Sequence, residues 1–248
     1  MLIDAAHEEE TRVVVMDGNR VVDYDAEIAN KRPLKGNIYL AKVTRVEPSL
    51  QAAFVEYGGN RHGFLAFNEI HPDYYRIPIA DREALIAEEA EAQSGDDGEE
   101  GESVETVGGD ELEEVERRRV SMQRRYKIQE VIKRRQILLV QVVKEERGTK
   151  GAALTTYLSL PGRYCVLMPN TSRGGGISRK ITNARDRKRL KTVIDGLGIP
   201  DGMAVILRTA GSERSKAEIK RDYDYLLRLW NDIRESTLAS TASTLIYE

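Results

Sequence analysis

Apolar and polar residues alternate with a period of two at the start of the chain, which predicts three short strands. The three segments are residues 1–6, 11–16 and 21–28. The dipeptide Asp17-Gly18 favours a tight turn between the second and third strands. A polar segment that ends in proline follows at 30–33. We therefore expect a small β-meander that ends at a linker.

The same alternation returns at residue 37 and predicts the five strands of a second unit. They are residues 37–46, the two halves of 50–66, residues 137–143 and residues 152–160. Five strands of this length agree with an OB-fold β-barrel. We therefore expect such a barrel over residues 34–160, interrupted by a charged insert at 80–125.

The insert changes character along its length. Residues 77–91 are amphipathic, and we expect the insert to begin with a helix there. Residues 93–109 are mainly Gly, Ser, Asp and Glu, a composition that favours disorder. Residues 110–135 contain strong helix formers, apolar side chains spaced three and four apart, acids at the start and bases at the end. This pattern predicts a helix of at least about four turns that reaches Arg135.

After the last barrel strand, strand-like and helix-like patterns alternate. Residues 164–168 and 203–208 are apolar and rich in strand formers. Asn183 is a favourable N-cap for one helix, and Ser212 or Ser215 for a longer one with an apolar stripe. A glutamate stands three residues after Ser215, as in a capping box. A small α/β unit is expected here.

Composition adds that the charge is segregated. The net charge of the 248 residues is −3, but residues 88–116 contain 14 acids and no Lys or Arg, so the remainder carries +11. A basic folded part favours polyanions as partners. The single cysteine, Cys165, excludes an internal disulfide and lies in an apolar run, so we expect a buried thiol.

The sequence also bears on location and completeness. It has neither a signal peptide nor an apolar run near the ~18–20 residues of a membrane span. A cytoplasmic protein is expected. Residues 244–248 resemble the first half of a strand, which indicates a piece of a longer protein.

Candidate chemistry concentrates in residues 50–66. Phe54 and Phe64 have basic neighbours in the sequence, namely Lys42, Arg45, Arg61 and His62. Bases stack on aromatic rings and cations follow phosphates, so this pattern is typical of single-stranded nucleic-acid binding. The alternative is that one or both rings fill the barrel core. Lys150 lies in a Gly-Thr-Lys-Gly loop. It can contact a phosphate there, and the alternative is an ordinary exposed lysine.

A second candidate is the pair Arg208-Thr209 after a predicted strand. A guanidinium and a hydroxyl at this place can clamp a terminal monophosphate. The alternative is an ordinary surface arginine. The three histidines are too scattered for a metal site, and no acid–base pair indicates catalysis.

Several motifs together resemble the N-terminal part of the catalytic region of the ribonuclease E/G family. They are Gly36-Asn-Ile-Tyr, Val46-Glu-Pro-Ser-Leu-Gln-Ala-Ala-Phe-Val-Glu-Tyr-Gly, Arg61-His-Gly-Phe-Leu, Lys144-Glu-Glu-Arg-Gly-Thr-Lys-Gly, Val166-Leu-Met-Pro-Asn, Gly175-Gly-Ile-Ser-Arg and Leu207-Arg-Thr-Ala-Gly. The resemblance covers the chain except roughly residues 80–125, and the Arg61 motif fits the E branch better.

The resemblance implies an α+β fold with a split domain. An S1-type OB domain at 34–160 and a 5′-sensor at 161–212 would be inserted into an RNase H-like subdomain. That subdomain would comprise residues 1–33 and 213–248, without its catalytic carboxylates.

The resemblance also assigns roles to single residues. It implies RNA binding by Phe54, Phe64 and Lys150, with Arg61 beside them. It implies sensing of a 5′-monophosphate by Arg208 and Thr209, with Gly162 and Val166 as the wall for the terminal base and Arg179 as added charge.

By this resemblance, the chain is the RNA-recognition portion of a single-strand-specific endoribonuclease of RNA processing and mRNA decay. The chain itself would hold no catalytic residue, metal or cofactor and would be inactive alone. Catalytic Mg²⁺, the Zn²⁺ that joins protomers of a homotetramer, and any peripheral attachment to the inner membrane would belong to parts outside this chain. The alternative function is a non-catalytic RNA-binding or scaffold module that recruits a protein through the insert.

The resemblance implies proteins of the RNA degradosome as partners. A DEAD-box RNA helicase that binds residues 80–135 is the partner we expect first. Nine Lys or Arg residues in 117–135 favour extra RNA contact equally well.

Overall fold

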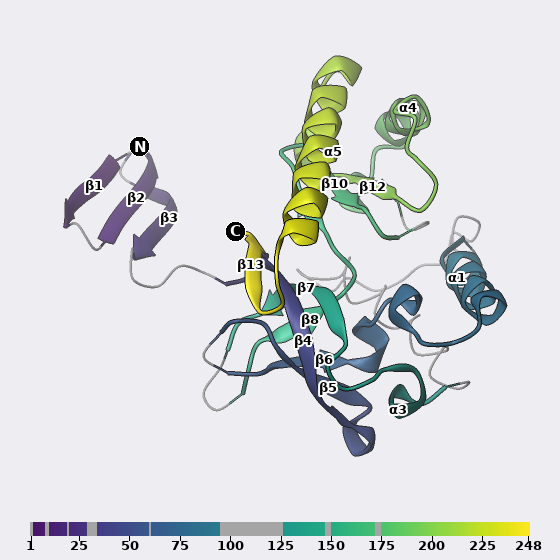
Figure 1. The fold of residues 1–248 in the computed structure, drawn as a ribbon. Helices are drawn as coiled ribbons and strands as arrows, with labels where there is room; N and C mark the ends of the chain where they lie inside the picture. Colours follow the sequence, from purple (N-terminus) through teal and green to yellow (C-terminus); the bar gives the residue numbers. More distant parts are fainter. Residues whose placement is uncertain are drawn as a thin grey trace. The chain divides into compact units, whose positions relative to one another are not determined.

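The computed structural model describes residues 2–7, 10–18, 20–28, 34–59, 61–94, 126–146, 150–171 and 175–248. The chain divides into two compact units, Met1–Lys35 and Gly36–Glu248 (Figure 1). The domain boundaries expected within the second unit, and the split RNase H-like subdomain, stay predictions.

The first unit is a three-stranded antiparallel sheet in the order β1-β2-β3. Its strands are β1 (Leu2–His7), β2 (Glu10–Asp17) and β3 (Arg20–Ile28). Val14 in the middle strand pairs with Leu2 on one side and Tyr24 on the other. The β-meander predicted from the alternating pattern is confirmed.

The second unit begins with a closed five-stranded barrel. Its strands are β4 (Ile38–Glu47), β5 (Ala52–Glu56), β6 (Gly63–Ala66), β7 (Ile137–Lys144) and β8 (Ala153–Thr155). They follow the order β4-β5-β6-β8-β7, and β7 pairs with β4 to close the barrel. The β6–β8 pair is parallel, whereas the other barrel pairs are antiparallel. The expected OB-type barrel and the α+β class are confirmed.

Side chains that alternate along the strands fill the barrel. Val43, Val55 and Leu65 have no exposed surface, and Leu154 is 2 % exposed. The short helices η1 (Pro48–Leu50), η2 (Phe67–Glu69) and η3 (Pro72–Tyr74) connect or follow the strands. β13 (Thr244–Tyr247) pairs antiparallel with the first half of β4.

The insert begins with a helix, as expected, but the long helix expected over 110–135 does not continue through residues 126–135. α1 spans Ile79–Ser94, and the only helix in residues 126–135 is the single turn α3, Ile128–Val131. Ile132 leaves the helical conformation and is buried, and the backbone of Arg135 adopts a left-handed conformation. The expectation that a helix reaches Arg135 was wrong, because burial of apolar side chains here outweighs helix propensity. Residues 95–125 lie outside the described residues.

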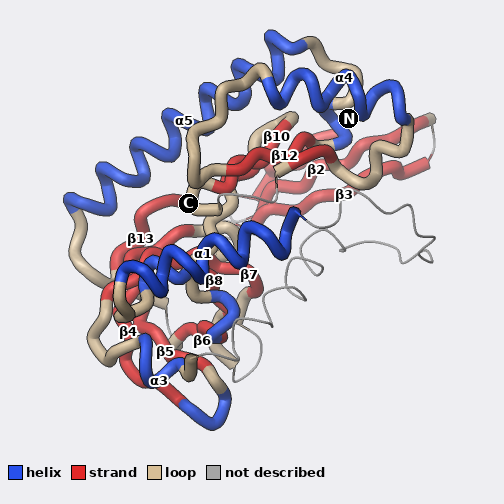
Figure 2. Tube along the Cα trace, turned by 90° about the vertical axis from the view of Figure 1, so that its right-hand side faces the viewer, coloured by secondary structure: helices blue, strands red, loops and turns tan. Residues whose placement is uncertain are grey.

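A second layer adjoins the barrel in the same unit (Figures 1 and 2). Its sheet has the order β11-β12-β10-β9. The strands are β9 (Leu160–Pro161), β10 (Cys165–Met168), β11 (Gly176–Ile177) and β12 (Ala204–Leu207), and the helices are α4 (Ala184–Asp195) and α5 (Lys216–Ala239). Leu160 therefore belongs to this sheet, and the single strand expected over 152–160 was wrong.

Both helices of this layer begin at the caps that the sequence predicts. The side chain of Asn183 accepts from the N–H of Arg185, and Ser215 forms a capping box with Glu218. Helix α5 packs on β10 and β9, and α4 packs beside β11.

One apolar core joins the second layer to the barrel. Cys165, Leu207 and Tyr223 belong to it, and so does Ile38 of β4. Cys165 has no exposed surface, which confirms the expected buried thiol, and burial raises its pKa. Because this core is continuous, the barrel and the second layer are positioned together. No helix in the described parts of the chain is long and apolar enough to cross a membrane.

Candidate nucleic-acid interface and phosphate site

Phe54 and Phe64 form an aromatic pair on the outer side of the barrel. They are direct cross-strand neighbours on β5 and β6, with ring centroids 5.9 Å apart and ring planes at 73°. Both rings are half-buried, whereas Ala53 and Val55 beside Phe54 point inward and have no exposed surface. The two rings therefore lie outside the barrel core, and the alternative that they fill it does not hold.

Arg45 adds a cation to this aromatic pair. It pairs with Phe54 across β4 and β5, and its guanidinium carbon lies 4.7 Å from the centre of the Phe54 ring. This distance is within the range of a cation–π contact. The sequence placed Arg45 among the basic neighbours but not in the site, because a register shift between Val43 and Arg45 determines this contact.

Lys150 is held close to the loop that contains Arg61. A Cβ on Gly151 would lie closer than 3.0 Å to the carbonyl oxygen of His62, so only glycine fits at this point. The N–H of Phe64 donates to the carbonyl of Ala152 at 2.8 Å. Lys150 and Arg61 are both exposed, and they flank the end of β6 that precedes Phe64. The four residues predicted to bind RNA therefore lie in one region of the barrel.

Tyr57 anchors the other end of the loop that leads to Lys150. Its hydroxyl donates to Oε1 of Glu146 at 2.9 Å, and its ring meets Tyr39 edge-on. Burial raises the pKa of Tyr57, and the hydrogen bond to Glu146 raises it further. The hydroxyl thus remains a neutral donor, and the strand and the loop stay connected.

The residues predicted to bind a phosphate around Arg208 lie at one end of the second sheet. Arg208 follows β12, its N–H donates to the carbonyl of Tyr164 at 2.8 Å, and its Nη1 donates to the carbonyl of Gly162 at 2.7 Å. Arg208 and Thr209 are exposed, and Thr209 begins the short helix η5, Thr209–Gly211. The structure therefore brings Gly162, Arg208 and Thr209 together.

Arg179 and Val166 approach this site less directly. The N–H of Ser178 donates to the carbonyl of Leu207, which sets Arg179 near the end of β12. Val166 pairs with Ile206 and with Pro161, further inside the sheet. It is half-buried and alternates with the buried residues of β10, so it lies on the face opposite the core.

Asp222 on α5 fixes the turn that carries Gly162. Its carboxylate accepts from the N–H groups of Arg163, Tyr164 and Cys165 at 3.1, 2.8 and 3.0 Å. A Cβ on Gly162 would lie 2.6 Å from this carboxylate. Burial alone would raise the pKa of Asp222, but the backbone donors outweigh it and the pKa is lowered.

Two arginines that sequence reasoning missed surround the ring of Tyr164. The guanidinium carbons of Arg163 and Arg214 lie 5.5 and 5.6 Å from the ring centre. Residues 163 and 214 are far apart in the chain, so no local pattern could have joined them. They add two cations beside the Arg208 site, because Tyr164 is also the backbone partner of Arg208.

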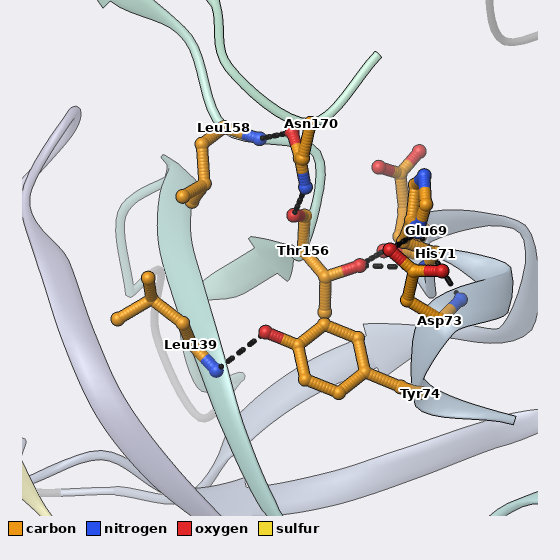
Figure 3. A network of polar contacts seen from close by, with 8 residues as sticks. All are labelled: Glu69, His71, Asp73, Tyr74, Leu139, Thr156, Leu158 and Asn170. Atoms are coloured by element: carbon orange, nitrogen blue, oxygen red, sulfur yellow. Dashed lines mark hydrogen bonds and ion pairs between the residues drawn. The ribbon is translucent and has the colours of Figure 1, made fainter. Parts of the chain in front are cut away.

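A polar network connects the barrel to the second sheet (Figure 3). The hydroxyl of Thr156 donates to the carbonyl of Glu69 at 2.8 Å and accepts from the N–H of His71 at 2.7 Å. Asn170, which follows β10, donates to the carbonyl of Thr156 at 2.6 Å and accepts from the N–H of Leu158 at 3.1 Å. The network therefore joins the chain after β8 to the segment of η2 and η3 and to the end of β10. His71 is buried and its ring accepts from the N–H of Asp73, so it has a structural role.

The strand order and the external aromatic pair define an α+β protein built on an OB-type barrel. Residues 159–248 match the Ribonuclease E/G family. The chain is 40% identical over all 248 residues to ribonuclease E of Haemophilus influenzae and 38% identical to that of Escherichia coli K12. It is 34% identical over 226 residues, 91% of this chain, to ribonuclease G of Escherichia coli K12. The chain belongs to the ribonuclease E/G family, as the motifs indicated.

The match covers only a part of each relative. The chain spans 22% and 19% of the two ribonuclease E proteins and 38% of the ribonuclease G protein. In the described residues, no group of three or more His, Cys, Asp or Glu side chains could hold a metal ion. The described part of the chain therefore offers no ligand set for the Mg²⁺ or Zn²⁺ that the resemblance implies.

Proposed function

We propose that this chain is the RNA-recognition part of a single-strand-specific endoribonuclease. In this proposal, single-stranded RNA crosses the outer face of the barrel, and a 5′-monophosphate is recognised at the Arg208 site. The observation that carries the proposal is the half-exposed Phe54–Phe64 pair on β5 and β6. These are the second and third strands of the barrel, the strands on which OB folds bind oligonucleotides.

The chemistry of this face supports single strands. Rings in this position can stack on bases that a duplex would hide, and stacking depends little on base identity. Arg45, Arg61 and Lys150 supply positive charge around the rings, which suits a phosphate backbone. The relatives named ribonuclease E and ribonuclease G favour RNA as the polymer.

The donor set around Arg208 supports a terminal phosphate. A guanidinium has five N–H donors, and Arg208 uses one of them within the described residues, to the carbonyl of Gly162. The remaining donors and the hydroxyl of Thr209 are available to phosphate oxygens. A 5′-monophosphate carries more charge and more acceptor oxygens than an internal phosphodiester, so this site would favour the 5′ end.

Binding of two RNA oligonucleotides that differ only at the 5′ end tests the phosphate site. Wild type should bind the 5′-monophosphate form more tightly than the 5′-hydroxyl form, and Arg208→Ala should remove this preference. Arg208→Lys should restore only part of it, because an ammonium cannot form a bidentate contact. Arg185→Ala, which removes an exposed arginine on α4, is the matched control. Equal losses for both oligonucleotides in Arg208→Ala would contradict the sensor.

We assign RNA cleavage to the protein as a whole and not to this chain. The support is that the described residues lack a cluster of carboxylates for metal-dependent hydrolysis. The isolated chain, incubated with labelled RNA and Mg²⁺, should bind the RNA and leave it intact. Cleavage that survives repeated purification would refute this assignment.

A further inference from the structure

A basic hollow lies on the outside of the barrel, beside β4. Its volume is about 470 Å³, and it is lined by Lys42, Val43, Thr44, Arg134 and Arg135. Three of these five residues are cationic, and none is acidic. Within the described residues, the side chains of Lys42, Arg134 and Arg135 form no hydrogen bond or ion pair. Cations that line an open hollow attract an anion.

The backbone holds this hollow in a fixed shape. The N–H of Val43 donates to the carbonyl of Gln136, and the N–H of Arg135 donates to the carbonyl of Val43, both at 2.8 Å. The turn that carries Arg134 and Arg135 is thus bonded directly to β4. The position of these two arginines is set by the fold and not only by flexible side chains.

Arg135 occupies a backbone conformation that favours glycine. Its φ is 67°, in the left-handed region, which costs a non-glycine residue about 1 kcal/mol or more. Glycine would adopt this φ without that cost. A strained arginine in a hollow with two other cations points to a use for its guanidinium.

The hollow and the aromatic pair share the strand β4. The hydroxyl of Thr44, in the lining, donates to the carbonyl of Phe54 at 2.9 Å. The next residue, Arg45, covers the ring of Phe54. Val43 points into the core, so Lys42 before it points outward, and the register shift after Val43 turns Arg45 outward as well. A strand stacked on Phe54 can therefore continue over Arg45 into the hollow.

We propose that this hollow binds a backbone phosphodiester of the RNA strand that stacks on Phe54. The inference rests on the proposed RNA-binding function and extends its path across β4 to the turn at 133–136. The ligand is a phosphodiester and not a base, because the lining offers cations and no aromatic ring. The contact adds affinity without sequence preference, and it weakens as salt is raised.

The test uses the double variant Arg134→Ala/Arg135→Gly. Arg135→Gly relieves the left-handed strain, so the variant should fold, and its thermal unfolding verifies this. The matched control is Lys133→Ala, which removes a neighbouring exposed charge outside the lining. The probe is a 5′-hydroxyl oligouridylate of about 12 nucleotides, within the site sizes known for OB folds. Its 5′-hydroxyl leaves the Arg208 site out of the measurement.

Affinity is measured by fluorescence anisotropy from about 50 to 200 mM salt. The double variant should bind roughly tenfold more weakly at low salt, and the slope of log K against log salt should fall by about 0.7 for each phosphate that the variant no longer neutralises. Lys133→Ala should retain the wild-type slope. These three results together support the hollow as part of the RNA path.

Other results would overturn the inference in distinguishable ways. If the double variant keeps the wild-type affinity and slope, the hollow is not part of the RNA path. If Lys133→Ala loses as much RNA affinity as the double variant, the loss reflects net positive charge and not the hollow. Inorganic phosphate that binds the hollow, together with unchanged RNA affinity in the double variant, identifies a free-anion site instead. Failure of the wild-type chain to bind the probe refutes the proposed function itself.

Discussion

The carboxylate of Asp222 accepts a hydrogen bond from the backbone N–H of Tyr164 at 2.8 Å. This bond joins helix α5 to the turn that carries Gly162, and Tyr164 and Gly162 are both backbone partners of Arg208. The geometry around Arg208 therefore depends on a residue outside the proposed phosphate site. In that proposal, Asp222 is a positioning residue.

We predict that Asp222→Asn loosens this turn. The amide retains one acceptor oxygen but presents an NH₂ group to backbone donors, so the free energy of unfolding should fall by about 2 kcal/mol. The preference for 5′-monophosphate RNA should decrease, while binding of 5′-hydroxyl RNA stays unchanged. Urea unfolding and the paired oligonucleotides measure the two effects. Asp232→Asn, an exposed substitution on the same helix, is the control and should change neither quantity.

The same carboxylate predicts how stability depends on pH. The pKa of Asp222 is lowered below its ordinary value of 3.8 in the folded state, since backbone hydrogen bonds outweigh burial. As pH falls, the unfolded state therefore takes up this proton first, and the stabilisation disappears as pH passes down through the folded pKa. The stability difference between wild type and Asp222→Asn should be constant between about pH 7 and pH 5 and shrink in more acidic solution. A difference that grows toward acid pH would contradict the assignment.

The strands and caps could be predicted because they depend on local signals. Period-two alternation gave the meander and four of the five barrel strands nearly in full, and Asn183 and Ser215 gave the helix starts. The last barrel strand was predicted too long because Thr156 bonds to the carbonyl of Glu69, where the chain leaves the barrel. That bond joins residues 87 positions apart, and no local pattern contains it.

Single residues of the candidate sites could be named from the sequence, but the contacts between them could not. Phe54, Lys150 and Arg208 could be named from residue type and motif. The position of Arg45 over the ring of Phe54 depends on a register shift. The hydrogen bond from Tyr164 to Asp222 joins residues 58 positions apart. Such contacts follow from the three-dimensional packing, which periodicity does not encode.

The three phenylalanines of the chain give a matched test of the aromatic face. Phe54 and Phe64 are half-buried, whereas Phe67 is 2 % exposed. We predict that Phe54→Ala or Phe64→Ala weakens binding of single-stranded RNA by roughly 5- to 150-fold, because a stacked ring contributes about 1–3 kcal/mol. Both variants should keep the wild-type circular dichroism spectrum.

Phe67→Ala is the control for loss of a ring from the core. It should lower the free energy of unfolding by about 3–5 kcal/mol. If Phe54→Ala or Phe64→Ala unfolds the chain as Phe67→Ala does, the two rings support the barrel and not the RNA.

The last prediction concerns Gly151, which separates Lys150 from the last barrel strand. A Cβ at this position would overlap the carbonyl oxygen of His62, and both partners are backbone, so neither can rotate away. Gly151→Ala should push the Lys150 loop from the β5–β6 loop and weaken the bond between Phe64 and Ala152. We expect a loss of about 1–3 kcal/mol in the free energy of unfolding, typical of overpacking. RNA affinity should fall further than in Lys150→Ala, which removes one exposed charge and should leave the melting temperature unchanged. A wild-type melting temperature in Gly151→Ala would mean that the two loops can separate freely, and Lys150 would then have no fixed place beside Phe64.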